Sequence, residues 1–433
     1  MSVLSIRSRL TGIDNDAKDL IFQGIRNGQT VTMADVFAVD QYVRNIKRND
    51  AWKNISFFRD FSLIPNLNPA GGPRITFTRA SSATRVNQQG VIETVSTNVP
   101  RFDYDPATGA AKGLLIEEAR TNLVLRSNEF SNAVWISSGI TISSVSSTDP
   151  AGNSTSFRAL ISSGGSQGTR TFQQTYTGSV ASTTFTFSIY VKSNTGASQT
   201  FALKLTQAGV ADNFSSNLTA TSDWQKFSFT KTFIAGGTGA IVGIVCDSLN
   251  NSSDLLIYGA QLEAGSFPTS YIPTTSATVT RGADLASISG VFFDSIYNKI
   301  ENGFLVQCSV TNLATYPVIG FSGGTDNGTR LQMQNNNNLI QTLRDSVNGA
   351  ADYGLGVTYV QSGKFASMFK ASDYSLCLNG GTVATSSNTW MINPSSILLG
   401  STSASAYLNG YISRFIYFRK KLTNSAIQSI TSS

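Results

Sequence analysis

The chain of 433 residues contains no histidine. Histidine is the commonest general base near neutral pH and the commonest protein ligand for metals, so the chain lacks the usual residue for both roles. Serine–histidine–carboxylate triads, zinc hydrolases and iron sites built from two histidines and one carboxylate are therefore excluded in their usual forms.

Charge and cysteine are also scarce. Charged residues make up 13% of the chain, roughly half of the usual share, and the net charge is +6. The densest basic run is at residues 44–48, where a solvated helix face explains it, so we expect no nucleic-acid partner. Cys246, Cys308 and Cys377 lie far apart in apolar, strand-like runs. We therefore expect them to be buried hydrophobic residues rather than disulfide partners or reactive thiols.

Long hydrophobic runs are missing as well. No apolar run approaches the ~20 residues that a membrane helix needs. The opening residues lack the apolar core of a signal peptide. We therefore expect a protein made in the cytoplasm, neither secreted nor inserted into a membrane.

The residues that fill the polar share are Ser, Thr, Asn, Gln and Gly, a bias that fits strands joined by turns. Residues 184–193 alternate cleanly, with Phe185, Phe187, Ile189 and Val191 on one face. Similar runs continue to the C-terminus with Gly-rich turns and few helical patterns between them. We predict a mostly β fold with two antiparallel sandwiches or jelly rolls in series, at residues 71–285 and 286–433.

Helical periodicity is concentrated in residues 1–70. Two short amphipathic helices are predicted, and the second has a narrow apolar seam formed by Val36, Val39, Val43 and Ile46. Such helices bury little by themselves, so another subunit or the following domain must cover the seam. We interpret residues 1–70 as an attachment and oligomerisation region.

Residues 258–284 join the two predicted sandwiches. Residues 258–263 read as a core strand. Pro268 and Pro273 then require an extended, non-helical path. We interpret the segment as a structural connection and not as a chemical site.

Four aromatic residues are candidates for ligand contact. Trp224 and Tyr190 fall on the polar face of predicted strands, and Trp135 and Trp390 lie in polar, loop-like surroundings. Aromatic rings beside amide groups suit the stacking and hydrogen bonding that hold sugars. The alternative is that a second layer of the protein covers these rings.

Catalytic and metal-binding patterns are weak. A glycosidase needs two carboxyl groups facing each other across a cleft, whereas adjacent Glu117 and Glu118 would point to opposite faces of a strand. We therefore expect no enzyme activity, no transition-metal site and no cofactor. If an ion is bound, calcium near Asp326 or Asp373 is expected.

Several motifs together carry a resemblance to a known class of protein. The landmarks in residues 75–135 are FTRASSAT, PRFDYDP, GLLIEEARTNL and SNEFSNAVW. They resemble a module of tailed-bacteriophage and prophage structural proteins, and residues 259–284 resemble the end of that module. The span between them is similar to the jelly rolls of carbohydrate-binding modules. Residues 286–433 are similar to a laminin-G or concanavalin-like sandwich.

The resemblance implies a non-enzymatic virion structural protein, similar to a tail fibre or adhesin, that contacts host surface glycans and other virion proteins. It would be assembled in the host cytoplasm, and the N-terminal seam favours a homotrimer. A capsid head fibre, a decoration protein or a baseplate component is the alternative. A polysaccharide-depolymerase tailspike is a second alternative, disfavoured because the sequence shows no β-helix pattern and no acid pair.

Overall fold

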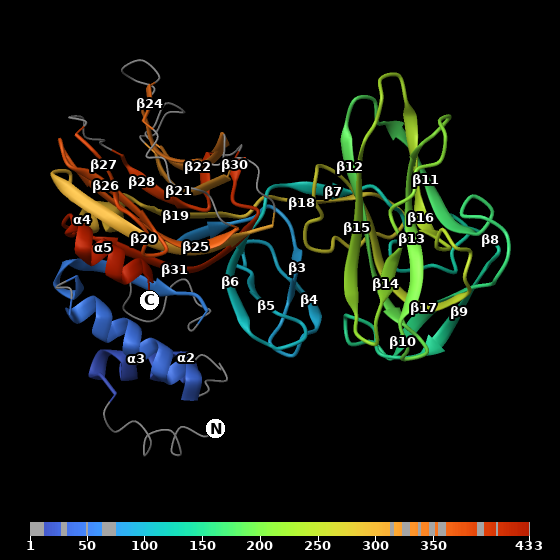
Figure 1. Cartoon of the computed structure of the whole chain (residues 1–433), viewed down its shortest axis with the longest axis horizontal. Helices are drawn as coiled ribbons and strands as arrows, with labels where there is room; N and C mark the ends of the chain where they lie inside the picture. Colours follow the sequence, from blue (N-terminus) through green and yellow to red (C-terminus); the bar gives the residue numbers. More distant parts are fainter. Residues whose placement is uncertain are drawn as a thin grey trace. The chain divides into compact units, whose positions relative to one another are not determined.

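The computed structural model of the chain describes residues 13–26, 33–48, 51–62, 75–311, 316–322, 330–336, 339–345, 351–353, 361–387, 394–403 and 406–432. The chain forms two compact units, both discontinuous in sequence. Unit 1 comprises Met1–Arg79, Asn98–Glu118 and Ala283–Ser433. Unit 2 comprises Ala80–Thr97 and Ala119–Gly282. Each unit is built from antiparallel sheets (Figure 1), which confirms the predicted mostly β fold.

The described residues of unit 1 form two large antiparallel sheets. One has the strand order β27-β26-β25-β20-β31-β6-β5, with β1 also paired to β31, and the other has the order β2-β19-β28-β21-β22-β23-β24. The strands of the first sheet are β1 (Ile55–Asp60), β5 (Phe102–Tyr104), β6 (Ala111–Ile116), β20 (Glu301–Val310), β25 (Ser362–Lys370), β26 (Tyr374–Leu378), β27 (Ala384–Ser386) and β31 (Gly410–Phe418). Those of the second are β2 (Thr76–Thr78), β19 (Leu285–Ser289), β21 (Tyr316–Ser322), β22 (Arg330–Asn336), β23 (Leu339–Asp345), β24 (Ala351–Tyr353) and β28 (Ser396–Leu399). A short pair, β29 (Ser401–Ser403) and β30 (Ala406–Tyr407), completes the unit.

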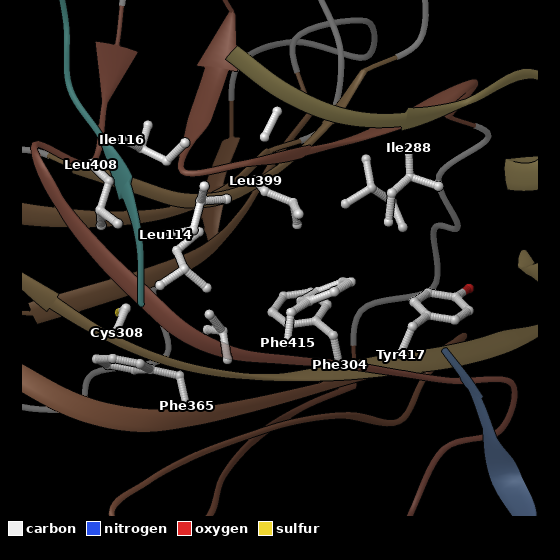
Figure 2. Close-up of a cluster of buried hydrophobic side chains, with 14 of the residues drawn as sticks. Leu114, Ile116, Ile288, Phe304, Cys308, Phe365, Leu399, Leu408, Phe415 and Tyr417 are labelled. Carbon is white, nitrogen blue, oxygen red and sulfur yellow. The ribbon is translucent and has the colours of Figure 1, made fainter. Parts of the chain in front are cut away.

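The main core of unit 1 lies between these two sheets. Phe304 of β20 and Phe415 of β31 come from the first sheet, while Ile288 of β19 and Leu399 of β28 come from the second. Figure 2 shows these side chains pointing toward one another. All four are fully buried. Because strand side chains alternate between faces, the neighbouring residues of β20 and β31 point to the opposite side of the first sheet.

Two of the helices cover that opposite side, whereas the helix at residues 290–296 packs into the main core through Phe293 and Ile296. Unit 1 contains α2 (Asn15–Arg26), α3 (Met33–Arg48), α4 (Gly290–Ile296), α5 (Asn424–Ser432) and the short 3-10 helix η1 (Trp52–Asn54). Tyr42 and Ile46 of α3 and Ile427 of α5 pack in one buried cluster with Leu305 of β20 and Ile416 of β31. Unit 1 therefore has three layers: a helical layer that includes α3 and α5, then the first sheet, then the second sheet.

The apolar seam of α3 is covered inside unit 1. Val36 and Val43 are buried, and α2 packs along α3. The amide of Asn45 donates to the carbonyl of Ser429 in α5 at 2.9 Å. Of the two ways to cover the seam that the sequence allowed, the structure shows burial within the chain. The seam therefore no longer argues for a second subunit.

Unit 2 is a sandwich of two five-stranded antiparallel sheets, in the orders β15-β12-β17-β10-β9 and β14-β13-β16-β11-β8. The strands of the first are β9 (Ile140–Ser146), β10 (Thr155–Ile161), β12 (Thr184–Ser193), β15 (Gln225–Thr232) and β17 (Ser253–Ala264). Those of the second are β8 (Ile136–Ser138), β11 (Thr171–Ser179), β13 (Gln199–Gln207), β14 (Leu218–Ala220) and β16 (Thr238–Val245). Two small pairs are added: β3 (Ala83–Val86) with β4 (Ile92–Val95), and β7 (Arg120–Asn122) with β18 (Val279–Arg281).

The core of unit 2 follows the predicted alternation. The four apolar residues of β12 all point inward and are at most 3% exposed: Phe185, Phe187, Ile189 and Val191. The other face of β12 and β17 is the outer face of the sandwich. The segment after β17 follows the extended path that its prolines require. Over β17, the amide of Thr269 donates to Glu263 and the amide of Ile272 to Gln261.

The division into units differs from the predicted boundaries at residues 70/71 and 285/286. Residues of the predicted N-terminal region belong to unit 1, and unit 2, at residues 80–97 and 119–282, is inserted into the sequence of unit 1 at two places. The reason is long-range pairing. Leu114 of β6 pairs with Ile412 of β31, and Phe77 of β2 pairs with Ala286 of β19. Local patterns in a sequence carry no information about such pairings.

Candidate functional site

An aromatic cluster on the outer face of unit 2 brings together two of the predicted contact residues. Tyr258 of β17 and Tyr271 are buried, and their ring centroids lie 5.4 Å apart in an edge-on arrangement. Tyr190 of β12 and Trp224, which precedes β15, pack against them and are half-buried. The two half-buried rings therefore rest on a base of two buried tyrosines.

Strand register explains why these residues meet. Tyr190 lies opposite Tyr258 on one side and opposite Lys226 of β15 on the other. Its ring centroid is 6.1 Å from that of Tyr258. Side chains directly opposite each other on antiparallel strands are close neighbours, so the pairing places these three on one face.

Polar contacts fix the rim of the cluster. The indole Nε1 of Trp224 donates to the carbonyl of Thr148 at 3.0 Å. The ammonium of Lys226 lies 5.5 Å from the centroid of the Tyr190 ring and donates to the carbonyl of Thr269. A cation over an aromatic face is attracted by the ring quadrupole. The half-exposed rim thus offers two aromatic rings and an oriented cation.

The buried tyrosines stay neutral over the whole range around neutral pH. Burial raises the pKa of Tyr258 above its usual value. Burial also raises the pKa of Tyr271, although the hydrogen bond with Ser127 opposes the shift. The hydroxyls of Ser127 and Tyr271 are 2.7 Å apart. This cluster can hold a flat or hydroxylated ligand by stacking and hydrogen bonding, and it presents no activated nucleophile.

Trp135 follows the alternative stated for the candidate aromatic residues, because the protein itself covers its ring. It is 6% exposed and lies in the core of unit 2. Its ring stacks on that of Phe172 with centroids 5.1 Å apart, and its indole nitrogen donates to the carbonyl of Arg126 at 3.1 Å. Polar residues near it in the sequence, such as Ser131 and Ser137, are exposed. Trp390 lies outside the described residues.

Sequence reasoning left three members of this surface out of the candidate residues: Lys226, Tyr258 and Tyr271. The alternation of residues 224–230 places Lys226 on the same strand face as Trp224. This pattern could have identified Lys226 from the sequence. Tyr258 and Tyr271 could not be assigned in this way. They lie on a different strand and on the segment that crosses it, and only the sheet register brings them to Tyr190.

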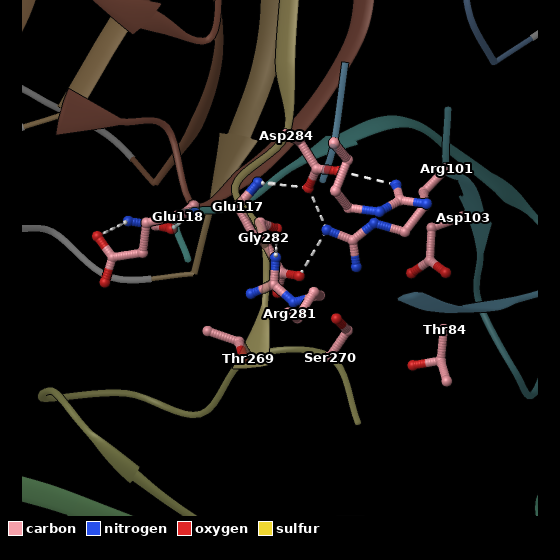
Figure 3. Close-up of polar contacts among 12 residues, drawn as sticks. Thr84, Arg101, Asp103, Glu117, Glu118, Thr269, Ser270, Arg281, Gly282 and Asp284 are labelled. Carbon is pink, nitrogen blue, oxygen red and sulfur yellow. Dashed lines mark hydrogen bonds and ion pairs between the residues drawn. The ribbon is translucent and has the colours of Figure 1, made fainter. Parts of the chain in front are cut away.

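A second group of charged residues is buried in unit 1. Asp284 accepts a hydrogen bond from Arg79 at 3.1 Å and pairs also with Arg101, whose guanidinium contacts Glu117 at 2.8 Å. Figure 3 shows Asp284, Arg101 and Glu117 converging. The side chains of Arg79, Arg101 and Asp284 have no exposed surface. Burial opposes the charge of Arg101, but the carboxylates of Asp284 and Glu117 outweigh it and raise the pKa of Arg101.

The residues of this buried ionic group come from the sequence motifs quoted above. Arg79 belongs to FTRASSAT, Arg101 to PRFDYDP and Glu117 to GLLIEEARTNL, while Asp284 ends the later segment. Glu118 has separate partners, since its backbone amide donates to the side chain of Asn409 at 2.9 Å. The two adjacent glutamates therefore have different environments, although both follow the end of β6 and do not lie on opposite faces of a strand. Two arginines facing two carboxylates form a closed ionic cluster that holds chain segments together.

Metal-ligating residues do not gather in the described part of the chain, where no three Cys, Asp or Glu side chains converge. Asp373 is described, and it pairs with Lys421 at 3.2 Å. Asp326 lies outside the described residues, so calcium near either residue stays a prediction. The three cysteines are free and buried, as predicted. Burial raises the pKa of Cys308 to about 12. No described helix has the length and apolar character of a membrane span.

No protein-family model matches the sequence, and no curated protein matches it either. Among solved structures, a xylan-binding CBM22 domain from Paenibacillus barcinonensis is 12% identical, with a TM-score of 0.27, and the match covers 35% of this chain and 99% of that one. The sialyllactose-bound CBM40 of a Ruminococcus gnavus sialidase is 13% identical, with a TM-score of 0.28, over 33% of this chain and 88% of that one.

Bacteriophage CBA120 tailspike protein 4 is 16% identical, with a TM-score of 0.25, over 33% of this chain and 21% of the tailspike chain. The matches cover almost all of each carbohydrate-binding module but only about a fifth of the tailspike chain. At these identities and scores, none of the three assigns a ligand or an activity to this chain.

Proposed function

We propose that this chain is a non-enzymatic structural protein of a tailed-bacteriophage virion, similar to a tail fibre or adhesin, whose unit 2 contacts glycans of the host surface. The resemblance of residues 75–135 and 259–284 to phage structural modules supports the virion part of the proposal. The single observation that carries the glycan part is the half-buried pair of Trp224 and Tyr190 on the outer face of the sandwich.

The chemistry of the pair fits a sugar. A pyranose ring has apolar C–H faces that stack on aromatic rings and hydroxyls that need hydrogen-bond partners. Two half-exposed rings with Lys226 beside them provide both kinds of contact. Stacking of this type contributes about 1 kcal/mol per ring, so one site binds weakly. A virion carries many copies, and avidity turns weak sites into firm attachment.

A homotrimer is part of the proposal, because fibres usually assemble with rotational symmetry. The apolar seam of α3 is buried within unit 1, so the trimer does not depend on that seam. Sedimentation velocity of the full chain tests the point. A trimer is expected, and a monomer at micromolar concentration would remove this part of the proposal.

The experiment for glycan contact is adsorption of phage particles that carry single substitutions. Trp224→Ala and Tyr190→Ala are expected to lower the adsorption rate to host cells severalfold, with the particle count and the melting temperature retained. Phe37→Ala is the matched control, because Phe37 is an aromatic residue on α3 of unit 1 and is 54% exposed. It should leave adsorption unchanged.

A specific observation favours the alternative role as a head fibre, decoration protein or baseplate component. Trp224 and Tyr190 also pack against Ile92 of β4 and Tyr258, so the rings serve as a small core beneath the β3–β4 hairpin. If adsorption is unchanged in both variants while stability falls, the rings are packing residues and unit 2 is a spacer. A depolymerase would instead release oligosaccharides from purified host polysaccharide, and none should be released.

A further inference from the structure

The outer side of β15 presents a row of side chains that extends away from the aromatic pair. Alternate residues of a strand share a face, and Trp224, Lys226, Ser228, Thr230 and Thr232 are such alternate residues. Inward-facing Phe227 and Phe229 pack against the core of unit 2, which confirms the direction of the alternation. We name these five residues the β15 strip.

Contacts with β12 fix the strip in place. Thr230 Oγ1 lies 2.8 Å from Thr186 Oγ1, and Thr232 Oγ1 lies 2.8 Å from Thr184 Oγ1. Each hydroxyl pair uses one donor and leaves acceptor capacity on both oxygens. Ser228, Thr230 and Thr232 are exposed, so this capacity faces solvent. The hydroxyls of Thr230 and Thr232 are therefore oriented and do not rotate freely.

The segment that follows β17 runs along the strip. Lys226 donates to the carbonyl of Thr269 at one point, and Thr230 donates weakly to the carbonyl of Ser266 at another, at 3.5 Å. β15 is the outermost strand of its sheet, so none of the described strands pairs with it on the other side of the strip. The strip is thus bordered on one side and open on the other.

Ser188 marks a point of unmet hydrogen-bonding capacity beside the strip. It lies opposite Ser228 in the strand register and is fully buried. Its Oγ has no hydrogen-bond partner within the described part of the chain.

We infer that the β15 strip binds an extended run of several sugar units along the strand, with the aromatic rings of Trp224 and Tyr190 at one end. The distance from Trp224 to Thr232 is eight residues of extended chain, or about 26 Å at ~3.3 Å per residue. A site for one terminal sugar would use only the aromatic end. This inference rests on the proposed glycan contact and specifies a polymer interior as the ligand.

The test uses the full-length protein and purified host surface polysaccharide cut into fragments of one, two, four and six sugar units. Affinity for each size is measured by titration calorimetry. Wild-type affinity should rise steadily with fragment length. A Ser228→Ala/Thr230→Val/Thr232→Val variant should bind the longest fragment about tenfold more weakly, because two or three hydrogen bonds are lost. Its affinity for the shortest fragment that binds should not change.

Thr219→Val is the matched control, because Thr219 is an exposed threonine on β14 of the opposite sheet. It should bind like wild type, and melting curves check that all variants are folded. Wild-type affinity that does not rise with length would overturn the inference, even where binding depends on Trp224. Equal affinity of the triple variant and wild type for the longest fragment would also overturn it. Absence of binding to every fragment would overturn both the inference and the proposed glycan contact.

Discussion

Glu117 and Asp284 hold each other through two hydrogen bonds, although they are 167 residues apart in sequence. The backbone amide of Asp284 donates to the carbonyl of Glu117 at 2.9 Å. In return, the amide of Glu117 donates to the Asp284 carboxylate at 3.0 Å. Unit 1 is interrupted in sequence between Glu118 and Ala283. This pair joins the two ends of unit 1 at that interruption. The carboxylate of Asp284 also forms ion pairs with Arg79 and Arg101.

Removing the charge of Asp284 should therefore be costly. Asp284→Asn leaves two fully buried arginines with one carboxylate, and breaking a buried ion pair costs about 3–5 kcal/mol. Urea unfolding of the variant should show a loss of this order. Asp294→Asn, an exposed carboxylate on α4, should change the free energy of unfolding by less than about 0.5 kcal/mol. Equal stability of the two variants would show that the ionic cluster does not hold unit 1 together.

Gly113 should not tolerate a side chain. Its φ is +109°, and a Cβ atom there would lie 2.4 Å from the carbonyl oxygen of Ile412 in β31. Gly113→Ala should lose about 3 kcal/mol or more, from the strained backbone and the displaced strand together. Gly164→Ala separates the two effects, because Gly164 has φ +83° and nothing within 4 Å. That control should lose only about 1–2 kcal/mol. Similar losses would mean that β6 can move away from β31 at little cost.

The two tryptophans of unit 2 should differ sharply in stability. Trp135→Ala empties a site in the core and should cost about 3–5 kcal/mol of unfolding free energy. Trp224 is half-buried, so Trp224→Ala should cost clearly less while it weakens glycan contact. Thermal melting and calorimetry of the two purified variants measure both properties. A larger stability loss for Trp224 than for Trp135 would contradict the assignment of Trp135 to the core.

Alkaline pH should unfold the protein partly through Tyr42. Burial raises the pKa of Tyr42 from 10.0 to about 12, with the carboxylate of Asp60 adding to the shift and Arg414 opposing it. Because the folded value is the higher one, the stability that this shift represents is complete below pH 10. It is lost as the pH rises from 10 through 12. Tyr42→Phe should lose less stability than wild type between pH 9 and pH 12. Parallel pH profiles for both proteins would refute the prediction.

Acid pH should act through Asp254 in unit 2. The hydrogen bonds from Arg158, both 2.7 Å long, lower the pKa of Asp254 below its ordinary value of 3.8, and Asn194 adds to the effect. A depressed value means that the stabilisation is present above about pH 4 and is lost as the pH falls through the folded pKa. The pair is partly exposed, so it contributes less than about 1 kcal/mol. Asp254→Asn should be slightly less stable at pH 7 and equal to wild type at pH 2, which unfolding at both pH values will test.

Local pattern determined much of this protein. Alternation placed Phe185 and its neighbours in β12 on the core face, and the 3.6-residue period placed Val36, Val43 and Ile46 on the buried side of α3. The apolar runs around the cysteines predicted their burial. These features depend on residues a few positions apart, which share a strand face or a helix stripe whatever the rest of the chain does.

Only the tertiary structure decided which distant segments meet. Arg79, Arg101, Glu117 and Asp284 lie on four separate segments, and their convergence follows from strand pairings more than a hundred residues apart. The same holds for Tyr190 and Tyr258, whose contact depends on the register of β12 with β17. Trp135 is the clearest case. Its polar sequence neighbours made it a candidate for ligand contact, but the fold places its ring on Phe172 of β11, where a large aromatic surface is buried.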